Sequence, residues 1–376
     1  MLSCAEASGD LYAGALARDL KALRPDVTIT GFGGPHFAAA GGELLADFRG
    51  LAVTGITEAI PKIPEFLRTR RLLVAEAERR RPDVLVVIDS PDFNFRLAPA
   101  IKRLGIPIVY YISPQVWAWR RGRLKRMRAF VDRVLVIFPF EESIYRDAGV
   151  PVEFVGHPLV ELSPQIEKAR ARAEFCRALG LDSAAPLIAL LPGSRANEVK
   201  RILPDLASAV QRIRNQVAAA QFVVARAPRL DDVLFEAARG LQGLRIVEGQ
   251  TDTVLAAVDV ALTASGTATV QTALHDTPMV IVYRVSPLTY ELGRRLVRVA
   301  SIGMVNLIAG EQIVPELIQD AFTPDAVARE AVSMLTDPVR AQTVRKGLAD
   351  VRARLGGPGA SRRAANSILG LIKEKS

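Results

Sequence analysis

The sequence predicts an α/β protein built from two doubly wound parallel-sheet domains in series. Short runs rich in Val, Ile and Leu alternate with helical patterns along most of the chain. Such strand-helix-strand repetition is typical of a parallel sheet with helices on both faces. The rhythm is interrupted once, over residues 160–181, which are charged, helical and without an evident strand. A length of 376 residues also favours two hydrophobic cores over one.

The expected domains are residues 1–160 and 186–335, joined by a linker at 161–185, with a cleft between them. The first domain should begin with a very short strand, followed by strands at Val27–Gly31, Val84–Asp89, Ile106–Ile112, Arg133–Phe138 and Val152–Val155. Strands of the second domain are expected at Leu187–Leu191, Gln221–Ala225, Leu244–Glu248, Val258–Thr263 and Met279–Arg284. Helical patterns separate them, for instance at Gly9–Leu23, Asn197–Val217 and Gly266–Leu274. The helical residues 336–376 should pack back on an N-terminal domain, either their own or that of a partner in a homodimer.

The charge balance favours anionic partners. Lys and Arg exceed Asp and Glu by nine, and the excess is concentrated in the expected helix Glu65–Arg81 and in the segment Trp117–Arg128. A basic surface attracts phosphates, nucleic acid or acidic lipid headgroups, although a solvated helix face is the ordinary explanation of such runs. No nucleic-acid-binding motif accompanies the charge, so we expect no nucleic-acid partner.

Cysteine content and apolar run lengths suggest a cytoplasmic protein. Its two cysteines, Cys4 and Cys176, provide neither a disulfide framework nor a zinc cluster, which fits a reducing compartment. The longest apolar runs, such as Leu85–Ile88, are far shorter than the roughly 20 residues of a membrane-spanning helix. No basic or apolar segment precedes Cys4, so we expect no signal peptide.

The segment Asp83-Val-Leu-Val-Val-Ile-Asp-Ser-Pro-Asp-Phe-Asn94 is the strongest indication of a site. Its apolar run reads as a buried parallel strand that ends at Asp89, because Pro91 stops it. Ligands of open α/β sheets bind just beyond the carboxyl ends of such strands, which places Asp89, Asp92 and Asn94 near a substrate. Helix capping by Asp89 is the competing explanation.

Three further turns carry candidate ligand-binding groups. Gly9, in the segment Glu6-Ala-Ser-Gly-Asp10, permits a tight turn into a helix whose first N–H groups can hold an anion or a sugar oxygen. In Leu191-Pro-Gly-Ser-Arg195 the guanidinium can bind phosphate, or pair with Glu198. Ser265, Gly266 and Thr267 begin a helix, where a diphosphate would meet unpaired N–H donors. Each turn alone is also explained by ordinary capping.

Taken together, these segments resemble a known family. The matching stretches are Ala5-Glu-Ala-Ser-Gly-Asp10, Ile88-Asp-Ser-Pro-Asp-Phe-Asn94, Tyr111-Ile-Ser-Pro-Gln-Val-Trp-Ala-Trp-Arg120, Phe138-Pro-Phe-Glu141, Phe154-Val-Gly-His-Pro158, Leu191-Pro-Gly-Ser-Arg195, Ala264-Ser-Gly-Thr267 and Pro278-Met-Val-Ile-Val-Tyr-Arg284. The chain resembles the lipid-A-disaccharide synthases, which are glycosyltransferases of the two-domain GT-B architecture. The stretches follow the family's order, and their combination is very specific.

The resemblance implies a reaction. Members join UDP-2,3-diacylglucosamine to 2,3-diacylglucosamine 1-phosphate (lipid X), forming a β-1,6 linkage with inversion and releasing UDP. They act in lipid A biosynthesis at the inner face of the cytoplasmic membrane of Gram-negative bacteria. We expect no cofactor and no metal, since no Asp-x-Asp pattern is present and His36, His157 and His275 are scattered. His157, in the family's GHP stretch, is assigned to the domain junction.

The resemblance also assigns roles to residues. Inversion needs a base for the acceptor hydroxyl, for which Asp89 is the first candidate and Asp92 the reserve. The acceptor side comprises Glu6, Ser8, Gly9, Asp10 and Asn94. The UDP side comprises Gly193, Ser194, Arg195, Ser265, Gly266, Thr267, Gln271 and Asn306, although backbone capping is an alternative for Asn306.

An apolar cluster next to the basic helix is the predicted membrane contact. Ile60, Ile63, Phe66 and Leu67 lie beside the arginines of Glu65–Arg81 and are expected to meet the bilayer and admit acyl chains. Packing inside the first domain is the competing explanation.

Several residues depart from the family pattern. Gln271 stands where the family uses Glu to bind the ribose, so a charge-assisted hydrogen bond is lost. Ala5 replaces a frequent glycine and Val305 a usual proline. Two alternatives stay open: another GT-B transferase that uses UDP-N-acetylglucosamine, and a non-catalytic protein that binds nucleotide sugars or lipid phosphates.

Overall fold

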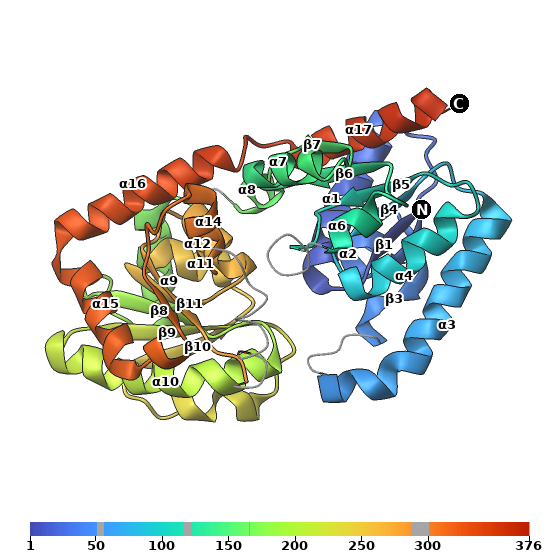
Figure 1. The fold of residues 1–376 in the computed structure, drawn as a ribbon. Coiled ribbons are helices and arrows are strands. Elements are labelled where there is room, and N and C mark those ends of the chain that lie inside the picture. Colours follow the sequence, from blue (N-terminus) through green and yellow to red (C-terminus); the bar gives the residue numbers. More distant parts are fainter. Residues whose placement is uncertain (51–55, 116–121, 165, 287–289, 291–300, 376) are drawn as a thin grey trace. The chain divides into compact units, whose positions relative to one another are not determined.

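The computed structural model describes the chain except residues 51–55, 116–121, 165, 287–289, 291–300 and 376 (Figure 1). Of residues 50, 56–62 and 373–375 only the backbone is described. The chain forms two compact units, Met1–Glu161 with Leu355–Ser376, and Leu162–Arg354. The first unit therefore combines both ends of the chain.

The first unit contains a seven-stranded sheet in the order β3-β2-β1-β4-β5-β6-β7, and all of its strand pairs are parallel. The strands are β1 (Leu2–Cys4), β2 (Thr30–Gly33), β3 (Glu43–Asp47), β4 (Leu85–Ile88), β5 (Ile108–Tyr111), β6 (Arg133–Val136) and β7 (Val152–Phe154). The helices are α1 (Ala7–Leu23), α2 (Pro35–Ala39), η1 (Phe48–Gly50), α3 (Ile56–Arg80), α4 (Pro91–Lys102), α6 (Gly122–Met127), α7 (Pro139–Asp147), α8 (Leu159–Leu162, at the unit boundary) and α17 (Ala360–Lys375). They form two layers, with α1, α2 and α17 packed together and α3 packed on α4 (Figure 1).

The second unit contains a six-stranded parallel sheet in the order β10-β9-β8-β11-β12-β13. Its strands are β8 (Leu187–Leu191), β9 (Gln221–Arg226), β10 (Leu244–Glu248), β11 (Val260–Ala264), β12 (Met279–Tyr283) and β13 (Glu316–Ile318). Its helices are α9 (Lys168–Leu179), α10 (Ala196–Gln216), η2 (Asp232–Ala238), α11 (Thr251–Ala257), α12 (Thr267–Leu274), α14 (Met304–Ala309), η3 (Gln319–Ala321), α15 (Pro324–Thr336) and α16 (Pro338–Arg354). Strands β8 and β11 are buried along their whole length, as their apolar sequences require.

The predicted fold class is confirmed, and each sheet has a topological switch point. In the first sheet the strand order reverses between β1 and β4, and in the second between β8 and β11. Connections that leave two adjacent strands in opposite directions open a crevice at their carboxyl ends, which is where ligands bind in doubly wound folds. The edge strands β3 and β13, which the sequence did not reveal, lie away from both switch points.

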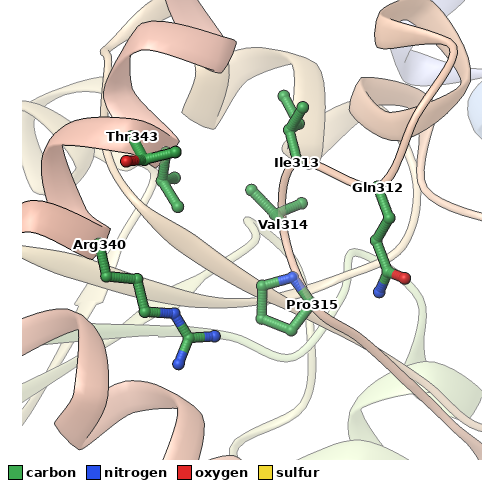
Figure 2. A pocket seen from close by; sticks show the side chains of 7 residues that line it. Gln312, Ile313, Val314, Pro315, Arg340 and Thr343 are labelled. Carbon is green, nitrogen blue, oxygen red and sulfur yellow. The ribbon is translucent and has the colours of Figure 1, made fainter.

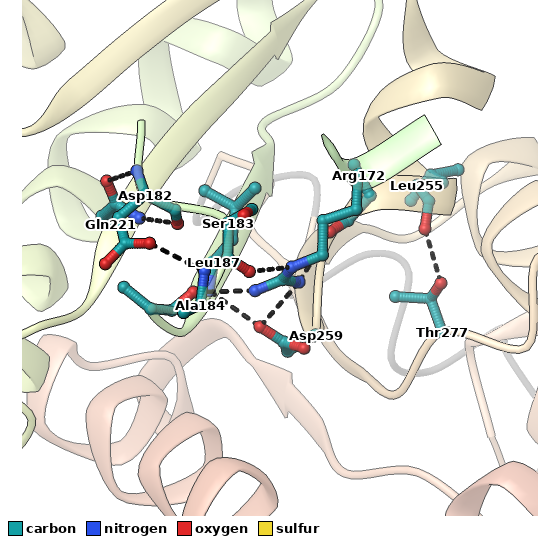
Figure 3. Close-up of polar contacts among 11 residues, drawn as sticks. Arg172, Asp182, Ser183, Ala184, Leu187, Gln221, Leu255, Asp259 and Thr277 are labelled. Atoms are coloured by element: carbon teal, nitrogen blue, oxygen red, sulfur yellow. Dashed lines mark hydrogen bonds and ion pairs between the residues drawn. The ribbon is translucent and has the colours of Figure 1, made fainter. Parts of the chain in front are cut away.

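Arg172 attaches the predicted linker to the second sheet (Figure 3). From α9 its guanidinium donates hydrogen bonds to the carbonyl oxygens of Ser183, Ala185 and Ala257 at 2.7–2.8 Å. It also pairs with the Asp259 carboxylate at 3.1 Å, and that carboxylate accepts the Leu187 N–H. Most of residues 161–185 thus belong to the second unit rather than to a separate connection.

The C-terminal helices divide between the units. Helix α16 packs on α12, α14 and α15 in the second unit, whereas α17 packs on α1 in the first. The buried face of α17 is mainly apolar: alongside Ser361 and Ser367 it buries Ala360, Ala364, Ala365, Ile368 and Leu371. Of residues 336–376, only those from Leu355 onward therefore return to the N-terminal unit.

Candidate active site

Asp89 occupies the switch point of the first sheet in an unusual backbone conformation. Asp89 and Ser90, directly after β4, have φ angles of 44° and 46°, and Ile112, directly after neighbouring β5, has 56°. Left-handed angles cost non-glycine residues about 1–3 kcal/mol and persist only when the surroundings enforce them. The two strand ends are joined, since the Asp89 N–H donates to the Ile112 carbonyl at 3.2 Å. Such concentrated strain at a ligand-binding edge is typical of a functional site.

Buried side chains enforce this conformation. The Asn94 amide donates to the carbonyl oxygens of Asp89 at 2.8 Å and of Ile88 at 3.2 Å. Its own oxygen accepts the Ser3 hydroxyl at 2.9 Å, and the Tyr110 hydroxyl also donates to the Asp89 carbonyl, at 2.8 Å. Asn94 is completely buried. We therefore assign it to holding the Asp89 turn rather than to acceptor contact.

The negative charge of Asp89 affects the pKa of two buried tyrosines, Tyr12 and Tyr110. Burial raises the pKa of Tyr12 and of Tyr110, and the negative charge of Asp89 raises both further. Both hydroxyls therefore stay protonated at neutral pH and can donate hydrogen bonds. Asp89 itself is half-buried, unlike Asp92, whose side chain is 86% exposed and pairs with Arg123 at 3.2 Å. This difference in environment favours Asp89 over Asp92 as the base.

The turn after β1 contains both structural and accessible groups. Gly9 packs α1 tightly against the sheet, since a Cβ there would lie 3.2 Å from the Cys4 Cβ. The Asp10 carboxylate accepts N–H bonds from Gly34, His36 and Phe37 at 2.8–3.0 Å and is 1% exposed. Asp10 therefore caps α2 and does not face an acceptor. Glu6 and Ser8 are half-buried beside the same strand end.

In the second unit Arg195 lies at the end of β8, on the switch point, as the N-cap of α10. Glu198 organises this turn, because its carboxylate accepts the N–H groups of Ser194 at 3.1 Å and Arg195 at 3.3 Å. Gly193 has a φ of 119°, and a Cβ there would lie 2.6 Å from the Glu198 Cβ, so glycine is required. The Arg195 guanidinium is 3.8 Å from Glu198 and its side chain is 53% exposed. A solvated ion pair of this length contributes little to stability.

The start of α12, on the adjacent strand end, is open. Gly266 has a φ of 144°, a Cβ added to it would meet no atom within 4 Å, and Gly266 and Thr267 are exposed. The Ser265 hydroxyl donates to the Ile302 carbonyl at 3.2 Å, which orients this turn. The exposed N–H donors at this helix start can receive an anion.

Gln271 is paired with a carboxylate that the sequence motifs did not reveal. Its amide donates to Asp252 Oδ1 at 2.8 Å, and His275 Nε2 lies 2.8 Å from the same oxygen. Burial raises the pKa of Asp252, but the hydrogen bonds from His275 and Gln271 outweigh it and lower that pKa overall. A negative charge thus lies beside residue 271, although α11 rather than α12 supplies it.

Asn306 is committed to the fold. Its amide donates to the Val314 carbonyl and to Glu316 at 2.7–2.9 Å, and its oxygen accepts the N–H groups of Ile313 and Val314 at 2.9–3.1 Å. These contacts use all of its hydrogen-bonding groups. With 1% exposure it supports the loop before β13, as the capping alternative anticipated, and does not face UDP.

The predicted membrane cluster divides into half-buried and exposed parts. The Phe66 ring packs edge-on against Phe93, with centroids 5.3 Å apart, and Leu67 is half-buried. Ile63 is 47% exposed, and Leu72 on the same helix is 42% exposed. The side chain of Ile60, like the segment Trp117–Arg120, lies outside the described residues.

A pocket of about 390 Å³ lies at the loop that Asn306 supports (Figure 2). The loop before β13 and helix α16 line it with Gln312, Ile313, Val314, Pro315, Arg340, Thr343 and Val344. Arg340 is engaged by Glu330 and by the Ser333 hydroxyl. None of the predicted site residues lines this pocket.

The described part of the chain shows neither a cluster of metal ligands nor a helix suited to a bilayer interior. No group of three or more His, Cys, Asp or Glu side chains in it is placed to hold a metal ion. Metal independence stays a prediction. No helix of that part is both long and apolar enough to cross a bilayer.

Comparisons with known proteins identify the family. The family model for lipid-A-disaccharide synthetase matches residues 1–367. The lipid-A-disaccharide synthase of Myxococcus xanthus is 45% identical over 369 residues, covering 98% of this chain and 96% of that protein. That of Syntrophus aciditrophicus is 41% identical over 377 residues, covering 100% and 98%.

Solved structures show the same fold at low identity. A UDP-GlcNAc 2-epimerase from Neisseria meningitidis bound to UDP-GlcNAc has a TM-score of 0.66 at 10% identity, with 98% of each chain covered. A calicheamicin glycosyltransferase has a TM-score of 0.59 at 16% identity, covering 99% of this chain and 97% of that one. With a full-length family match and two switch points of the glycosyltransferase fold, the chain belongs to the lipid-A-disaccharide synthase family.

Proposed function

We propose that this enzyme of lipid A biosynthesis transfers 2,3-diacylglucosamine from UDP to the 6-hydroxyl of 2,3-diacylglucosamine 1-phosphate, with inversion. The oxygen of that hydroxyl attacks the anomeric carbon of the donor as the bond from this carbon to the UDP oxygen breaks. Asp89 takes the hydroxyl proton, and UDP leaves with the bonding electron pair. The strained turn at the end of β4 carries the proposal, because it presents a half-buried carboxylate at a switch point.

Arg195 and the start of α12 are the proposed groups for the departing diphosphate. Both follow strands at the switch point of the second sheet, and both are exposed. A guanidinium and the positive end of a helix stabilise the negative charge that develops on the leaving group. Asp252, held by Gln271 and His275, is the carboxylate available for the ribose hydroxyls.

The enzyme is proposed to act at the surface of the cytoplasmic membrane, on its inner face. Each acyl methylene that leaves a bilayer costs about 0.8 kcal/mol, so substrates with several acyl chains are not extracted into water. Helix α3 supports this proposal, since it exposes Ile63 and Leu72 next to the exposed basic residues Arg68 and Arg71.

A turnover assay tests the function. UDP release is measured with both diacylated substrates for the native enzyme and for Asp89→Ala and Arg195→Ala. Loss of the base should lower kcat by about 10²–10⁴-fold, and loss of the guanidinium by about 10²–10³-fold. Tight donor binding without turnover by the native protein would instead favour a nucleotide-sugar-binding protein.

A further inference from the structure

Two arginines stack over one aromatic ring close to the Asp89 turn. The guanidinium carbon of Arg123 lies 5.1 Å from the centroid of the Phe95 ring, and that of Arg126 lies 5.9 Å from it. Phe95 is itself buried and fixed by Tyr110 and Phe130, whose ring centroids lie 6.1 and 5.6 Å away. The ring therefore offers both guanidiniums an aromatic contact, closer for Arg123 than for the exposed Arg126, since planar cations stack on aromatic faces.

This pair of arginines carries uncompensated positive charge. Arg123 is well anchored, with a side chain only 19% exposed, whereas its partner Asp92 is 86% exposed and 3.2 Å away. Among the described residues Arg126 has no ion-pair partner, although one of its neighbours is another cation. Two neighbouring guanidiniums, of which only Arg123 has a carboxylate partner within the described part of the chain and that one solvated, can receive an oxyanion, because their planar donors match phosphate oxygens.

The arginine pair also lies close to the reacting groups. Tyr110 contacts the Phe95 ring and donates its hydroxyl to the Asp89 carbonyl. Asp92 lies in the first turn of α4, three residues after Asp89. The positive charge of Arg123 opposes the rise in the pKa of Tyr110 that burial and Asp89 cause, which places Arg123 within electrostatic range of that hydroxyl.

We propose that Arg123 and Arg126, stacked on Phe95, bind a phosphate monoester on the acceptor sugar. The inference rests on the proposed function, because it assigns part of the acceptor to this surface. On binding, the phosphate displaces the exposed Asp92 carboxylate from Arg123. In the absence of acceptor, Asp92 is then the counter-ion of Arg123. Replacing Asp92 by an uncharged residue should therefore strengthen binding of the phosphate.

Two acceptors that differ only in the phosphate test the subsite. UDP release is measured with 2,3-diacylglucosamine 1-phosphate and with 2,3-diacylglucosamine, for the native enzyme and for Arg123→Gln. The substitution should lower kcat/KM for the phosphorylated acceptor by about 10–100-fold, as expected for lost charge-assisted hydrogen bonds. The value for the dephosphorylated acceptor should change little. An equal loss with both acceptors, or no loss, would overturn the subsite.

Companion variants separate the phosphate contact from folding. Arg123→Lys retains the positive charge but loses the planar, bidentate donors of the guanidinium. Its kcat/KM for the phosphorylated acceptor should lie between those of the native enzyme and Arg123→Gln. Arg103→Gln is the control. Arg103 is the exposed C-cap of α4, at the opposite end of that helix from Asp92, so removing its charge should leave acceptor preference unchanged. Asp92→Asn should lower KM for the phosphorylated acceptor, and a rise in that KM would contradict the displacement.

A binding measurement separates failure of the subsite from failure of the reaction. Glucosamine 1-phosphate and glucosamine are titrated calorimetrically into the native protein and into Arg123→Gln. Binding of the phosphate sugar by the native protein alone would support the subsite even if no acceptor were glycosylated. Equal binding by both proteins would refute the subsite and leave the transferase reaction untouched.

Discussion

At the scale of single residues, the candidate site depends on side chains that a substrate does not touch. The position of Asp89 at a strand end could be predicted from the sequence, because a buried apolar run followed by proline marks that end. The roles of Asn94 and Tyr110 could not, since their direction depends on how β4, α4 and β5 pack. For the same reason the sequence could not show that the polar groups of Asp10 and Asn306 point into the fold and not into the crevice.

Replacing Asn94 should disturb catalysis more than donor binding. Asn94→Ala removes the side-chain donor from the Ile88 and Asp89 carbonyls and frees the Asp89 turn to relax from its left-handed angles. We expect kcat to fall by at least about tenfold, since one misplaced group costs about that much or more, with donor KM nearly unchanged. The acid limb of the pH–rate profile should shift as well.

Asn215→Ala is the matched control, because Asn215 bonds Gln211 on the exposed face of α10. It should leave both kcat and the profile intact. If Asn94→Ala only lowers the melting temperature, and the folded variant keeps the native kcat and pH profile, Asn94 has no positioning role.

Restoring the family's glutamate at position 271 should not improve donor binding. In Gln271→Glu a second carboxylate would meet Asp252 Oδ1, which now accepts the Gln271 amide at 2.8 Å. Like charges at this distance cost on the order of 1 kcal/mol or more in a half-buried setting. We expect a higher donor KM and a lower melting temperature, measured by steady-state kinetics and thermal unfolding. The double variant with Asp252→Asn should reverse both changes, and a lower donor KM in the single variant would contradict the pairing.

At the scale of elements, most strands could be predicted, including the edge strands β7 and β10, whereas the edge strands β3 and β13 could not. The predicted Leu187–Leu191 and Leu244–Glu248 match β8 and β10, and β4, β5 and β12 differ from prediction by one or two residues at their ends. The sequence does not indicate β3 and β13, because Glu43–Asp47 and Glu316–Ile318 contain no continuous run of Val and Ile. The charged sequence of helix α9 predicts a linker, because it gives no sign of the Arg172 contacts that attach this helix to the second sheet.

Helix α3 allows a direct test of membrane contact. Phe66 supports Phe93, so its replacement would perturb packing, whereas Ile63 and Leu72 can be changed without opening the core. We expect Ile63→Ser combined with Leu72→Ser to weaken binding to anionic liposomes in a sedimentation assay, because apolar area and basic charge act together at a bilayer. Val339→Ser, at a residue 75% exposed in the second unit, is the control. Liposome binding equal to that of the native protein would exclude this surface.

At the scale of the whole molecule, the two units share one plan, in which each sheet places candidate ligand-binding residues at a reversal of strand order. The parallel-sheet fold of each unit could be predicted from the alternation of strands and helices. The return of residues 355–376 to the first unit could not, because α17 has the same amphipathic pattern whichever α/β unit it covers. The GHP stretch participates in that return, since the His157 N–H donates to the Leu355 carbonyl at 2.8 Å.

His157 should make the first unit sensitive to mild acid. Burial lowers its pKa to about 3, whereas an unfolded histidine titrates near 6.5. Between these values the unfolded state binds the extra proton, so stability is full above about pH 6.5 and falls as the pH decreases toward 3. From pH 7.5 to 5.5 we expect a loss of about 1.4 kcal/mol from this group.

Urea unfolding of the native protein and of His157→Gln at both pH values measures this effect. The variant should lose less stability than the native protein over the same interval. His36→Gln, at an exposed histidine of the same unit, should retain the native dependence. An unchanged pH dependence in His157→Gln would refute the assignment.

Because α17 covers α1, the order of synthesis and the order of folding differ for the two halves of this enzyme. On the ribosome, the unit made from one continuous stretch can close as soon as that stretch emerges. The unit that was translated first must wait with part of α1 uncovered until residues 360–375 have been translated. A stop codon before residue 355 would thus damage the N-terminal unit, and nascent chains would depend on chaperones at their amino-terminal half.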